Sequence, residues 1–260
     1  MVLNRYRNHL VAHRGYQRLY PENTLLSCQK AIDAGALNLE TDILLSADLQ
    51  PVLYHDPRLQ RVSGRAGKLN DLSLQQLSAV PAYEPKRLGK DFINETVTPL
   101  SAFVELLRKQ PQVTAYIEIK KEAIAFAGVT ETFLALTHCL KGMANQCCLI
   151  SFDYNFIAYA RHQGWRRCGI VLNHWKDLDK ADIQMIKPDT IFCKYQKIPK
   201  KARLGQIAAE IILYEIDDPQ RALYWLDRGA TKIETFDIGN MLKQMDACAN
   251  LIDSKLHLKE

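Results

Sequence analysis

Short apolar runs alternate with longer amphipathic segments along almost the whole chain, and this alternation limits the folds that the sequence can adopt. A strand–helix–strand order is typical of parallel sheets, because parallel neighbours need a long crossover between them. Eight of the apolar runs have the length of a strand, and eight is the number that closes a (β/α)8 barrel. The runs are His9 to His13, Leu37 to Ile43, Val113 to Ile119, Cys147 to Phe152, Cys168 to Leu172, Thr190 to Cys193, Ile211 to Ile216 and Thr231 to Thr235.

The segments between these runs have the spacing of amphipathic helices. The clearest are Thr24 to Ala34, Leu100 to Lys109, Tyr154 to His162 and Pro219 to Arg228. Gly35, Gly164 and Gly229 follow three of them, and glycine commonly ends a helix before the chain enters the next strand. The 260 residues are therefore expected to form one α/β domain, a single TIM barrel over residues 1–260.

One segment interrupts the alternation. Residues 57–97 are polar and rich in turn-forming Pro and Gly, and they contain no run with the pattern of a barrel strand. We interpret residues 57–97 as a small insertion after the second strand, which forms a partly ordered cap over one side of the barrel. A short helix is expected within it, starting near Asp71.

The composition narrows the classes of partner and compartment. The formal net charge is only +5 with scattered Lys and Arg, which argues against nucleic-acid binding and suits a small anionic ligand. None of the seven cysteines has the spacing of a zinc site, so we expect most to be reduced core residues. Without a signal peptide or an apolar run of about 20 residues, the protein is expected to be cytoplasmic with no integral membrane segment. The sequence leaves open whether it forms a homodimer.

Polar side chains stand at the ends of the first two predicted strands, the end at which barrel enzymes build their active sites. The first strand ends in His13 and Arg14, followed by Gly15, which permits a tight turn. In the second strand the two-residue alternation puts Glu40 and Asp42 on one face. Two carboxylates in a confined site repel each other, and a divalent cation bound by oxygen ligands removes that penalty.

The third predicted strand and the segment after the second add to this set. The same alternation puts Glu118 and Lys120 on one face, so that Glu118 could be a third metal ligand and Lys120 a point charge for a phosphate. A turn at Ala47 to Gln50 is expected to send the chain back. His55 could thereby approach His13, giving two imidazoles suited to proton transfer near neutral pH.

Each of these features also has a purely structural interpretation. A single histidine at a strand end is more often a hydrogen-bonding residue than a catalyst. The pairs Glu40 with Asp42 and Glu118 with Lys120 are equally compatible with salt-bridged polar layers inside a barrel. The functional interpretation is favoured because these features occur together.

Six short motifs occur in one order along the chain: AHRG, PENT (Pro21 to Thr24), LETD, YHD, IEIK and ISFD (Ile150 to Asp153). In this order and spacing they closely resemble the glycerophosphodiester phosphodiesterase family, which also has an insertion after the histidine and aspartate of the fourth motif. The resemblance covers roughly the first six tenths of the chain.

The resemblance implies a barrel enzyme that releases glycerol 3-phosphate and an alcohol from a small glycerophosphodiester. It implies that Glu40, Asp42 and Glu118 hold one divalent cation, Mg2+ or Ca2+, and that His13 and His55 are the general acid/base pair. The other positions that it assigns are those of substrate contacts or their support. Arg14 and Lys120 would neutralise the phosphate, Glu22 would support the first loop, Asn23 would cap the following helix, and Phe152 and Tyr214 would line the substrate pocket.

The later strands depart from the family pattern. Tyr214 stands where a tryptophan is common, and Phe236 follows Thr235 where the family usually has aspartate. These positions line the pocket for the non-reacting part of the substrate, so recognition of the alcohol or of glycerol may differ from that of relatives. Two alternatives therefore stay open: lysophospholipase D or sphingomyelinase-D-like action on a lipid phosphodiester, and a non-catalytic barrel that only binds its ligand.

Overall fold

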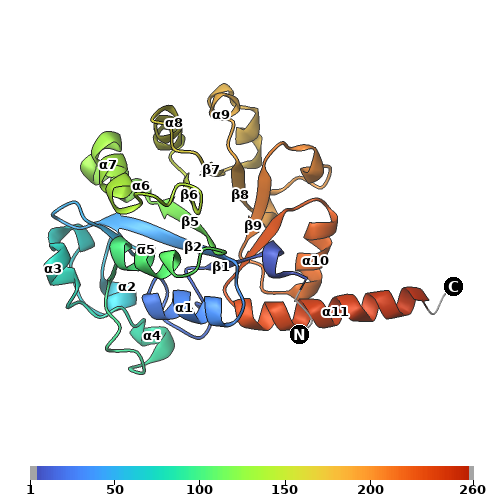
Figure 1. Ribbon diagram of the computed structural model, residues 1–260, viewed down its shortest axis with the longest axis horizontal. Helices are drawn as coiled ribbons and strands as arrows, with labels where there is room; N and C mark the ends of the chain where they lie inside the picture. The colour runs from blue at the N-terminus through green and yellow to red at the C-terminus, as the bar shows by residue number, and fades with distance from the viewer. Residues whose placement is uncertain (1–4, 258–260) are drawn as a thin grey trace.

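The computed structural model describes residues 5–257, with side chains described for residues 5–248, and its centre is a closed barrel of eight parallel strands (Figure 1). Each strand pairs with the next around the ring, and the last pairs with the first. The predicted (β/α)8 fold is confirmed, and every strand bound lies within two residues of the predicted one. In ring order the strands are β1 (Leu10–His13), β2 (Asn38–Leu45), β5 (Thr114–Ile119), β6 (Cys147–Ser151), β7 (Cys168–Val171), β8 (Thr190–Lys194), β9 (Glu210–Tyr214) and β10 (Lys232–Thr235).

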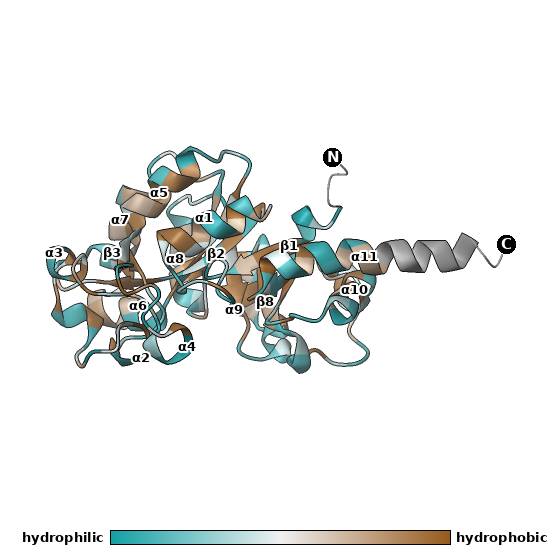
Figure 2. Cartoon of the chain, turned by 90° about the horizontal axis from the view of Figure 1, so that it is seen from below, coloured by the Kyte–Doolittle hydropathy of each residue, from teal (hydrophilic) through white to brown (hydrophobic). Residues whose placement is uncertain are grey.

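The two faces of each strand bury different kinds of side chain. The faces that point into the barrel meet in a small apolar cluster, which includes Val11, Tyr116, Cys148 and Phe192. The outward faces pack against the helices in a much larger cluster. In Figure 2 hydrophobic colour is concentrated on the strands, and the surrounding helices carry hydrophilic and hydrophobic residues in alternation. The barrel is therefore filled by side chains in its lower part, and only its mouth is left for polar groups.

Helices between the strands form the outer layer, and the four clearest sequence predictions are confirmed. They are α1 (Leu25–Asp33), α5 (Leu100–Arg108), α8 (Tyr154–His162) and α10 (Pro219–Asp227). The others are α6 (Lys121–Ala127), α7 (Val129–Cys139), α9 (Ala181–Ile186) and α11 (Ile238–His257), with 3-10 turns at Arg7–His9 and Trp175–Asp179. Gly35, Gly164 and Gly229 all have positive φ, as expected of glycines that end helices.

One connection has no α-helix. Between β8 and β9 the chain forms only two short 3-10 turns, Tyr195–Lys197 and Leu204–Gln206, within the part of the chain that the structure describes. Pro199 and Gly205 interrupt this stretch, and both disfavour a continuous helix. Gly205 also lies so close to Gly229 that a Cβ on Gly229 would be 2.6 Å from the Gly205 nitrogen.

The segment between β2 and α5 begins and ends with short antiparallel strands. β2 continues beyond the barrel to pair with β3 (Pro51–Leu53), as the predicted turn required, and β3 pairs with β4 (Thr98–Pro99). Between β3 and β4 lie α2 (Gln60–Ser63), a 3-10 turn (Leu69–Asp71), α3 (Leu74–Leu77) and α4 (Pro85–Leu88). The helix expected near Asp71 is α3, which begins after a capping box of Ser73 and Gln76.

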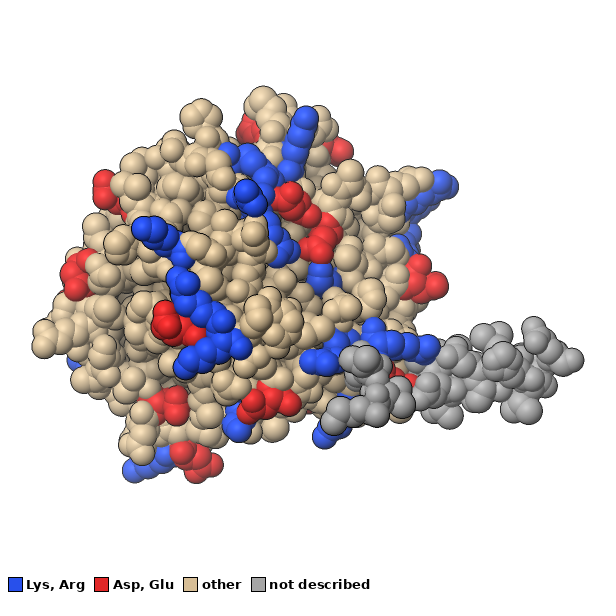
Figure 3. All heavy atoms as spheres, viewed as in Figure 1, with Lys and Arg blue, Asp and Glu red and all other residues tan. Residues whose placement is uncertain are grey.

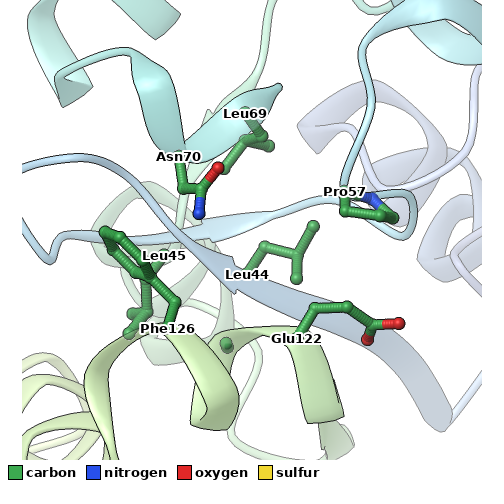
Figure 4. Close-up of a pocket in the computed structure, with 8 residues that line it drawn as sticks. Leu44, Leu45, Pro57, Leu69, Asn70, Glu122 and Phe126 are labelled. Atoms are coloured by element: carbon green, nitrogen blue, oxygen red, sulfur yellow. The ribbon is translucent and has the colours of Figure 1, made fainter. Parts of the chain in front are cut away.

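This inserted segment has an apolar cluster of its own, in which Leu59, Val62 and Leu77 pack with Leu44 and Tyr54. Where the segment meets α6, a pocket of about 230 Å³ is lined by mostly apolar side chains (Figure 4). They are Leu44, Leu45, Pro57, Leu69, Asn70, Glu122, Ala123 and Phe126. None of the predicted site residues is among them.

The surface and the helices bear on two expectations from composition. On the face shown in Figure 3, Lys and Arg side chains lie in separate groups with acidic side chains nearby, in agreement with the scattered charge in the sequence. Among the described residues, every helix is too short or too polar to cross a membrane.

Candidate active site

The carboxyl ends of the barrel strands surround a pocket of about 470 Å³, measured to include its opening to solvent. Nine of the ten residues predicted for the site line it; the tenth, Glu22, is buried behind Arg14. The lining residues are His13, Arg14, Glu40, Asp42, His55, Glu118, Lys120, Phe152, Val171, Phe192, Tyr214, Glu215 and Glu234. Residues that are far apart in the sequence therefore meet at one place, as the alternation of the strands predicted.

The loop after β1 turns sharply at two residues with positive φ, Arg14 (54°) and Gly15 (81°). A Cβ on Gly15 would lie 2.5 Å from Ser27 Oγ and 2.6 Å from the Ser27 carbonyl carbon, so only glycine fits. The Arg14 carbonyl accepts hydrogen bonds from the Asn23 backbone N–H and Ser27 Oγ, both at 3.1 Å. This packing fixes the Arg14 side chain at the edge of the pocket.

Three carboxylates form a group that could hold a metal ion. Glu40, Asp42 and Glu118 each offer an oxygen, and these oxygens lie within 4.8 Å of one another. Among the described residues no donor reaches the buried Glu40 Oε1, and an oxygen of this kind is suited to bind a cation. Burial, and then repulsion from Asp42, raise the pKa of Glu40 well above its usual range. The chemistry and spacing of these oxygens fit a hard divalent cation.

Cationic side chains balance part of this negative charge. Lys120, which directly precedes α6, places Nζ 3.2 Å from Asp42 Oδ1 and 2.7 Å from Glu118 Oε1. Arg14 Nε lies 2.9 Å from Asp42 Oδ2. Burial alone would raise the pKa of Asp42, but Arg14 and Lys120 outweigh it and hold that pKa well below the usual range. Both predicted phosphate-binding cations are thus in the pocket, ion-paired with the carboxylates.

Asn23 has a different role from the one expected. The N-cap of α1 is Thr24, whose side chain forms a capping box with Ser27. Asn23 instead has φ 55°, and its amide donates to Asp42 Oδ2 (2.9 Å) and accepts from the Asp42 backbone N–H (3.1 Å). The prediction that Asn23 caps the helix is therefore wrong, because α1 begins at Leu25 and this puts Thr24 at the cap position. Asn23 orients a carboxylate of the pocket.

Glu22 connects the β1 loop to the inserted segment. Its carboxylate accepts hydrogen bonds from Arg14 (3.1 Å), Gln17 (2.8 Å) and both terminal nitrogens of Arg61 (2.8 and 2.7 Å). Burial raises the pKa of Glu22, but Arg61 and Arg14 outweigh it and lower the pKa overall. Arg61, in α2, has no sequence signal that predicts this contact.

The two predicted histidines face the same pocket from different elements. His13 is buried, with Nε2 3.8 Å from Glu40 Oε2 and its ring 4.8 Å from the ring of Phe236. Burial, and then the charge of Arg14, lower the pKa of His13 well below its usual range. The Tyr54 backbone N–H donates to the Asp42 carbonyl (3.0 Å), which brings the next residue, His55, beside β2, and His55 Nδ1 lies 2.6 Å from Asp56 Oδ1.

The remaining wall of the pocket is largely apolar and carries two acidic residues that are not in the predicted site set. Phe152 and Tyr214 lie in this wall, as expected, together with Glu215 and Glu234. Glu234 is buried on the inward face of β10, and ligand atoms of His13, Glu40 and Glu234 lie within 4.8 Å of one another. The alternation in Lys-Ile-Glu-Thr at residues 232–235 was the signal that could have identified it.

Comparisons with known proteins agree with this arrangement. Residues 13–208 match the model of the glycerophosphoryl diester phosphodiesterase family. Glycerophosphodiester phosphodiesterase 1 of Bos taurus is 35% identical over 44% of this chain and 34% of its own length. Glycerophosphodiester phosphodiesterase of Caldanaerobacter subterraneus is 28% identical over 48% of this chain and 50% of its own length. The match thus spans a third to a half of the length of these two curated relatives.

Solved structures share the barrel over nearly the whole chain. An Oleispira antarctica phosphodiesterase, determined in complex with the product sn-glycerol-3-phosphate, has a TM-score of 0.80 at 21% identity, over 92% of this chain and 96% of its own. Glycerophosphodiester phosphodiesterase of Thermotoga maritima has a TM-score of 0.72 at 23% identity, over 90% and 97%. The structures establish the fold, and the match over residues 13–208 makes this chain a member of the glycerophosphoryl diester phosphodiesterase family.

Proposed function

We propose that this protein hydrolyses glycerophosphodiesters to glycerol 3-phosphate and an alcohol. The observation that carries this proposal is the meeting of two imidazoles, two cationic side chains and three carboxylates around one pocket at the barrel mouth. The product bound in the Oleispira antarctica relative and the names of the curated relatives support a substrate of this class.

We propose that Glu40, Asp42 and Glu118 hold one divalent cation, Mg2+ or Ca2+. When bound, such a cation supplies positive charge to a phosphate oxygen. Arg14 stays anchored by Asp42 and Glu22, so its guanidinium is oriented before the substrate arrives. Lys120 lies at the same edge of the pocket and adds a second positive charge for the phosphodiester.

His13 and His55 divide the proton transfers. The lowered pKa of His13 favours its neutral form, so it accepts the proton of the substrate's glycerol hydroxyl as that hydroxyl attacks phosphorus, and water then hydrolyses the resulting cyclic phosphate to glycerol 3-phosphate. His55, oriented by Asp56 at Nδ1, gives a proton to the oxygen of the leaving alcohol as its bond to phosphorus breaks. The two imidazoles are thus required in opposite protonation states, and the dependence of turnover on pH is expected to be bell-shaped.

Substitution of each histidine tests the assignment. His13→Ala and His55→Ala are each expected to lower kcat for glycerophosphocholine by about two to four orders of magnitude, the usual contribution of a general acid or base. His162→Ala is the matched control, because His162 is exposed on α8 and lies outside the pocket. Near-normal turnover in both pocket variants would show that the imidazoles are not the proton carriers.

Action on a lysophospholipid is the second candidate, and exposed apolar side chains support it. Leu19, in the loop after β1, is 52% exposed, and Ile93, in the inserted segment, is 43% exposed. Their neighbours Tyr20 and Phe92 pack ring to ring at 5.8 Å, which brings the two segments together. Parallel assays of glycerophosphocholine and a lysophosphatidylcholine, with and without chelator, separate the two functions. Binding of substrate and metal without release of product would instead indicate a non-catalytic barrel.

We propose further that residues 57–97 belong to the same phosphodiesterase domain as the barrel. This proposal is supported by two hydrogen bonds that Arg61, in the inserted segment, donates to Glu22. The Glu22 carboxylate also accepts a hydrogen bond from Arg14 at the pocket. Arg61→Ala is accordingly expected to raise KM for the phosphodiester more than it lowers kcat, since it loosens a residue that binds the phosphate.

A further inference from the structure

Glu234 is the buried carboxylate of the pocket that none of the proposed roles uses. It is 3% exposed and lines the pocket from β10, where it is paired in register with Val11 of β1. Among the described residues no hydrogen bond or ion pair reaches its carboxylate, and Oε1 is fully enclosed without a partner. Glu215, the other acidic residue of this wall, is more exposed and lies 3.2 Å from Lys194 Nζ.

An enclosed carboxyl oxygen without a donor is unfavourable, because it has lost its hydrogen bonds to water and gained none in the protein. Burial, and then repulsion from the carboxylate Glu118, outweigh the charge of Arg14 and raise the pKa of Glu234 well above its usual range. Phe152, Val171 and Phe192 on the adjoining wall have no hydrogen-bond donors in their side chains. The missing donor is therefore expected to come from a ligand.

The position of Glu234 selects which part of the substrate can reach it. Glu234 and Glu40 have ligand atoms within 4.8 Å of each other and of His13, so it lies beside the group that acts on phosphorus. A part of the substrate bound here must be small and only a few bonds from phosphorus. The glycerol half meets both conditions and carries two free hydroxyl donors, whereas the alcohol half must leave through the open mouth.

We propose that Glu234 determines specificity for glycerol by accepting a hydrogen bond from the terminal hydroxyl of the glycerol half. This inference rests on the proposed glycerophosphodiesterase activity. A site with an acceptor buried for one hydroxyl discriminates strongly against an analogue without it, because the acceptor is then left unpaired.

The test compares two substrates in two variants. The substrates are glycerophosphocholine and its analogue with the terminal CH2OH replaced by CH3, and the variants are Glu234→Gln and Glu234→Met. In the wild type, kcat/KM is expected to favour the glycerol substrate by about 10- to 100-fold, the range for a buried acceptor that loses its hydrogen-bond donor. Glu234→Met is expected to bring the ratio close to one, chiefly through loss of activity on the glycerol substrate, and Glu234→Gln, which keeps one acceptor oxygen, to lie between.

The control is Glu215→Gln, which changes an acidic residue of the same wall that already has a partner and is expected to keep the wild-type ratio. A purely structural role of Glu234 predicts an equal loss on both substrates and contradicts the inference. The inference is also contradicted if titration with Mn2+ shows two bound ions in the wild type and one in Glu234→Met with an unchanged ratio, since Glu234 would then be a ligand of a second cation.

A binding measurement separates this inference from the proposed function. Calorimetry with sn-glycerol 3-phosphate and with propane-1,2-diol phosphate asks the same question without turnover. If the wild type hydrolyses neither substrate, the proposed function fails. The inference about Glu234 is still tested by the dissociation constant of propane-1,2-diol phosphate divided by that of sn-glycerol 3-phosphate. This ratio is expected to exceed about 10 in the wild type and to approach one in Glu234→Met.

Discussion

Glu22 shows how one buried carboxylate can organise residues from two parts of the chain. Its side chain is 1% exposed and holds two guanidinium groups, Arg14 from the β1 loop and Arg61 from α2. Its backbone N–H donates to Glu84 Oε2 at 2.8 Å, a second contact with the inserted segment. A buried charge of this kind is tolerated when it is paired with opposite charges and hydrogen-bond donors. Removing one of these groups is strongly destabilising, because the charges that remain are buried without compensation.

The stability of the protein is therefore expected to depend on Glu22 in a pH-dependent way. The folded pKa of Glu22 is below its ordinary value of 4.5, so its ionised form stabilises the fold above that pH and the contribution is lost as the pH falls through the folded pKa. Glu22→Gln should lower the free energy of unfolding at pH 7 by about 3 kcal/mol. Urea unfolding at pH 7 and pH 3.5 measures this, and a deficit of equal size at both pH values would contradict it.

Residues on regular strands could be predicted from the sequence, and residues placed by tertiary contacts could not. The two-residue period of β2 and β5 was sufficient to bring Glu40, Asp42 and Glu118 together. Glu234 obeys the same period, with Lys232 two residues before it, but it lies outside the six motifs on which the site prediction was based. Arg61 reaches Glu22 across 39 residues from a four-residue helix, and no local pattern encodes such a contact.

At the scale of elements, the β1–α1 connection is the most constrained turn of the site. Gly15 has φ 81° and lies against the backbone of Ser27, so a side chain there both strains the turn and displaces the start of α1. Gly142 has the same φ, but a Cβ there would meet nothing within 4 Å. A comparison of substitutions at the two glycines therefore separates the energetic cost of a left-handed backbone from the cost of a steric clash with the added Cβ.

Gly142→Ala is expected to destabilise the protein by about 1 kcal/mol, the cost of a left-handed conformation for an L-residue. Gly15→Ala is expected to cost about 1 to 3 kcal/mol more, because overpacking adds to the strain. Chemical denaturation of both variants measures the difference. Equal losses would mean that the Ser27 backbone moves aside easily, and that this turn does not hold Arg14 in place.

The strands and most helices were predictable because their periods are local, whereas the exceptions depend on backbone conformation. The link from β8 to β9 was expected to resemble the others, and Pro199 with Gly205 prevented a helix there. Asparagine is a residue type that often occupies the N-cap, but here Thr24 is the N-cap of α1, and Asn23, with φ 55°, lies one residue before it. Composition indicates that a helix begins nearby, but it does not select which of two capping residues is used.

At the scale of the molecule, the pocket concentrates negative charge inside the barrel, and a cation that binds only the folded protein must stabilise it. Mg2+ or Ca2+ at about 100 times its dissociation constant is expected to add about 2.7 kcal/mol, which corresponds to a rise in Tm of about 5 to 10 °C. Glu118→Gln removes one carboxylate of the group and should shrink this rise. A thermal scan with metal and with chelator is the measurement, and an equal rise in both proteins would place the cation elsewhere.

The ring of strands is closed by the pairing of β1 with β10, and in the site this closure sets the ring of Phe236 against that of His13. The surroundings of His13, near the start of the chain, are therefore complete only once β10, the last strand of the barrel, has been added. A polypeptide cut at residue 208, where the family match ends, would keep the recognisable motifs but lack β9 and β10. β1 and β8 would then be unpaired edge strands, which promote association between chains, and the open sheet would not enclose a substrate.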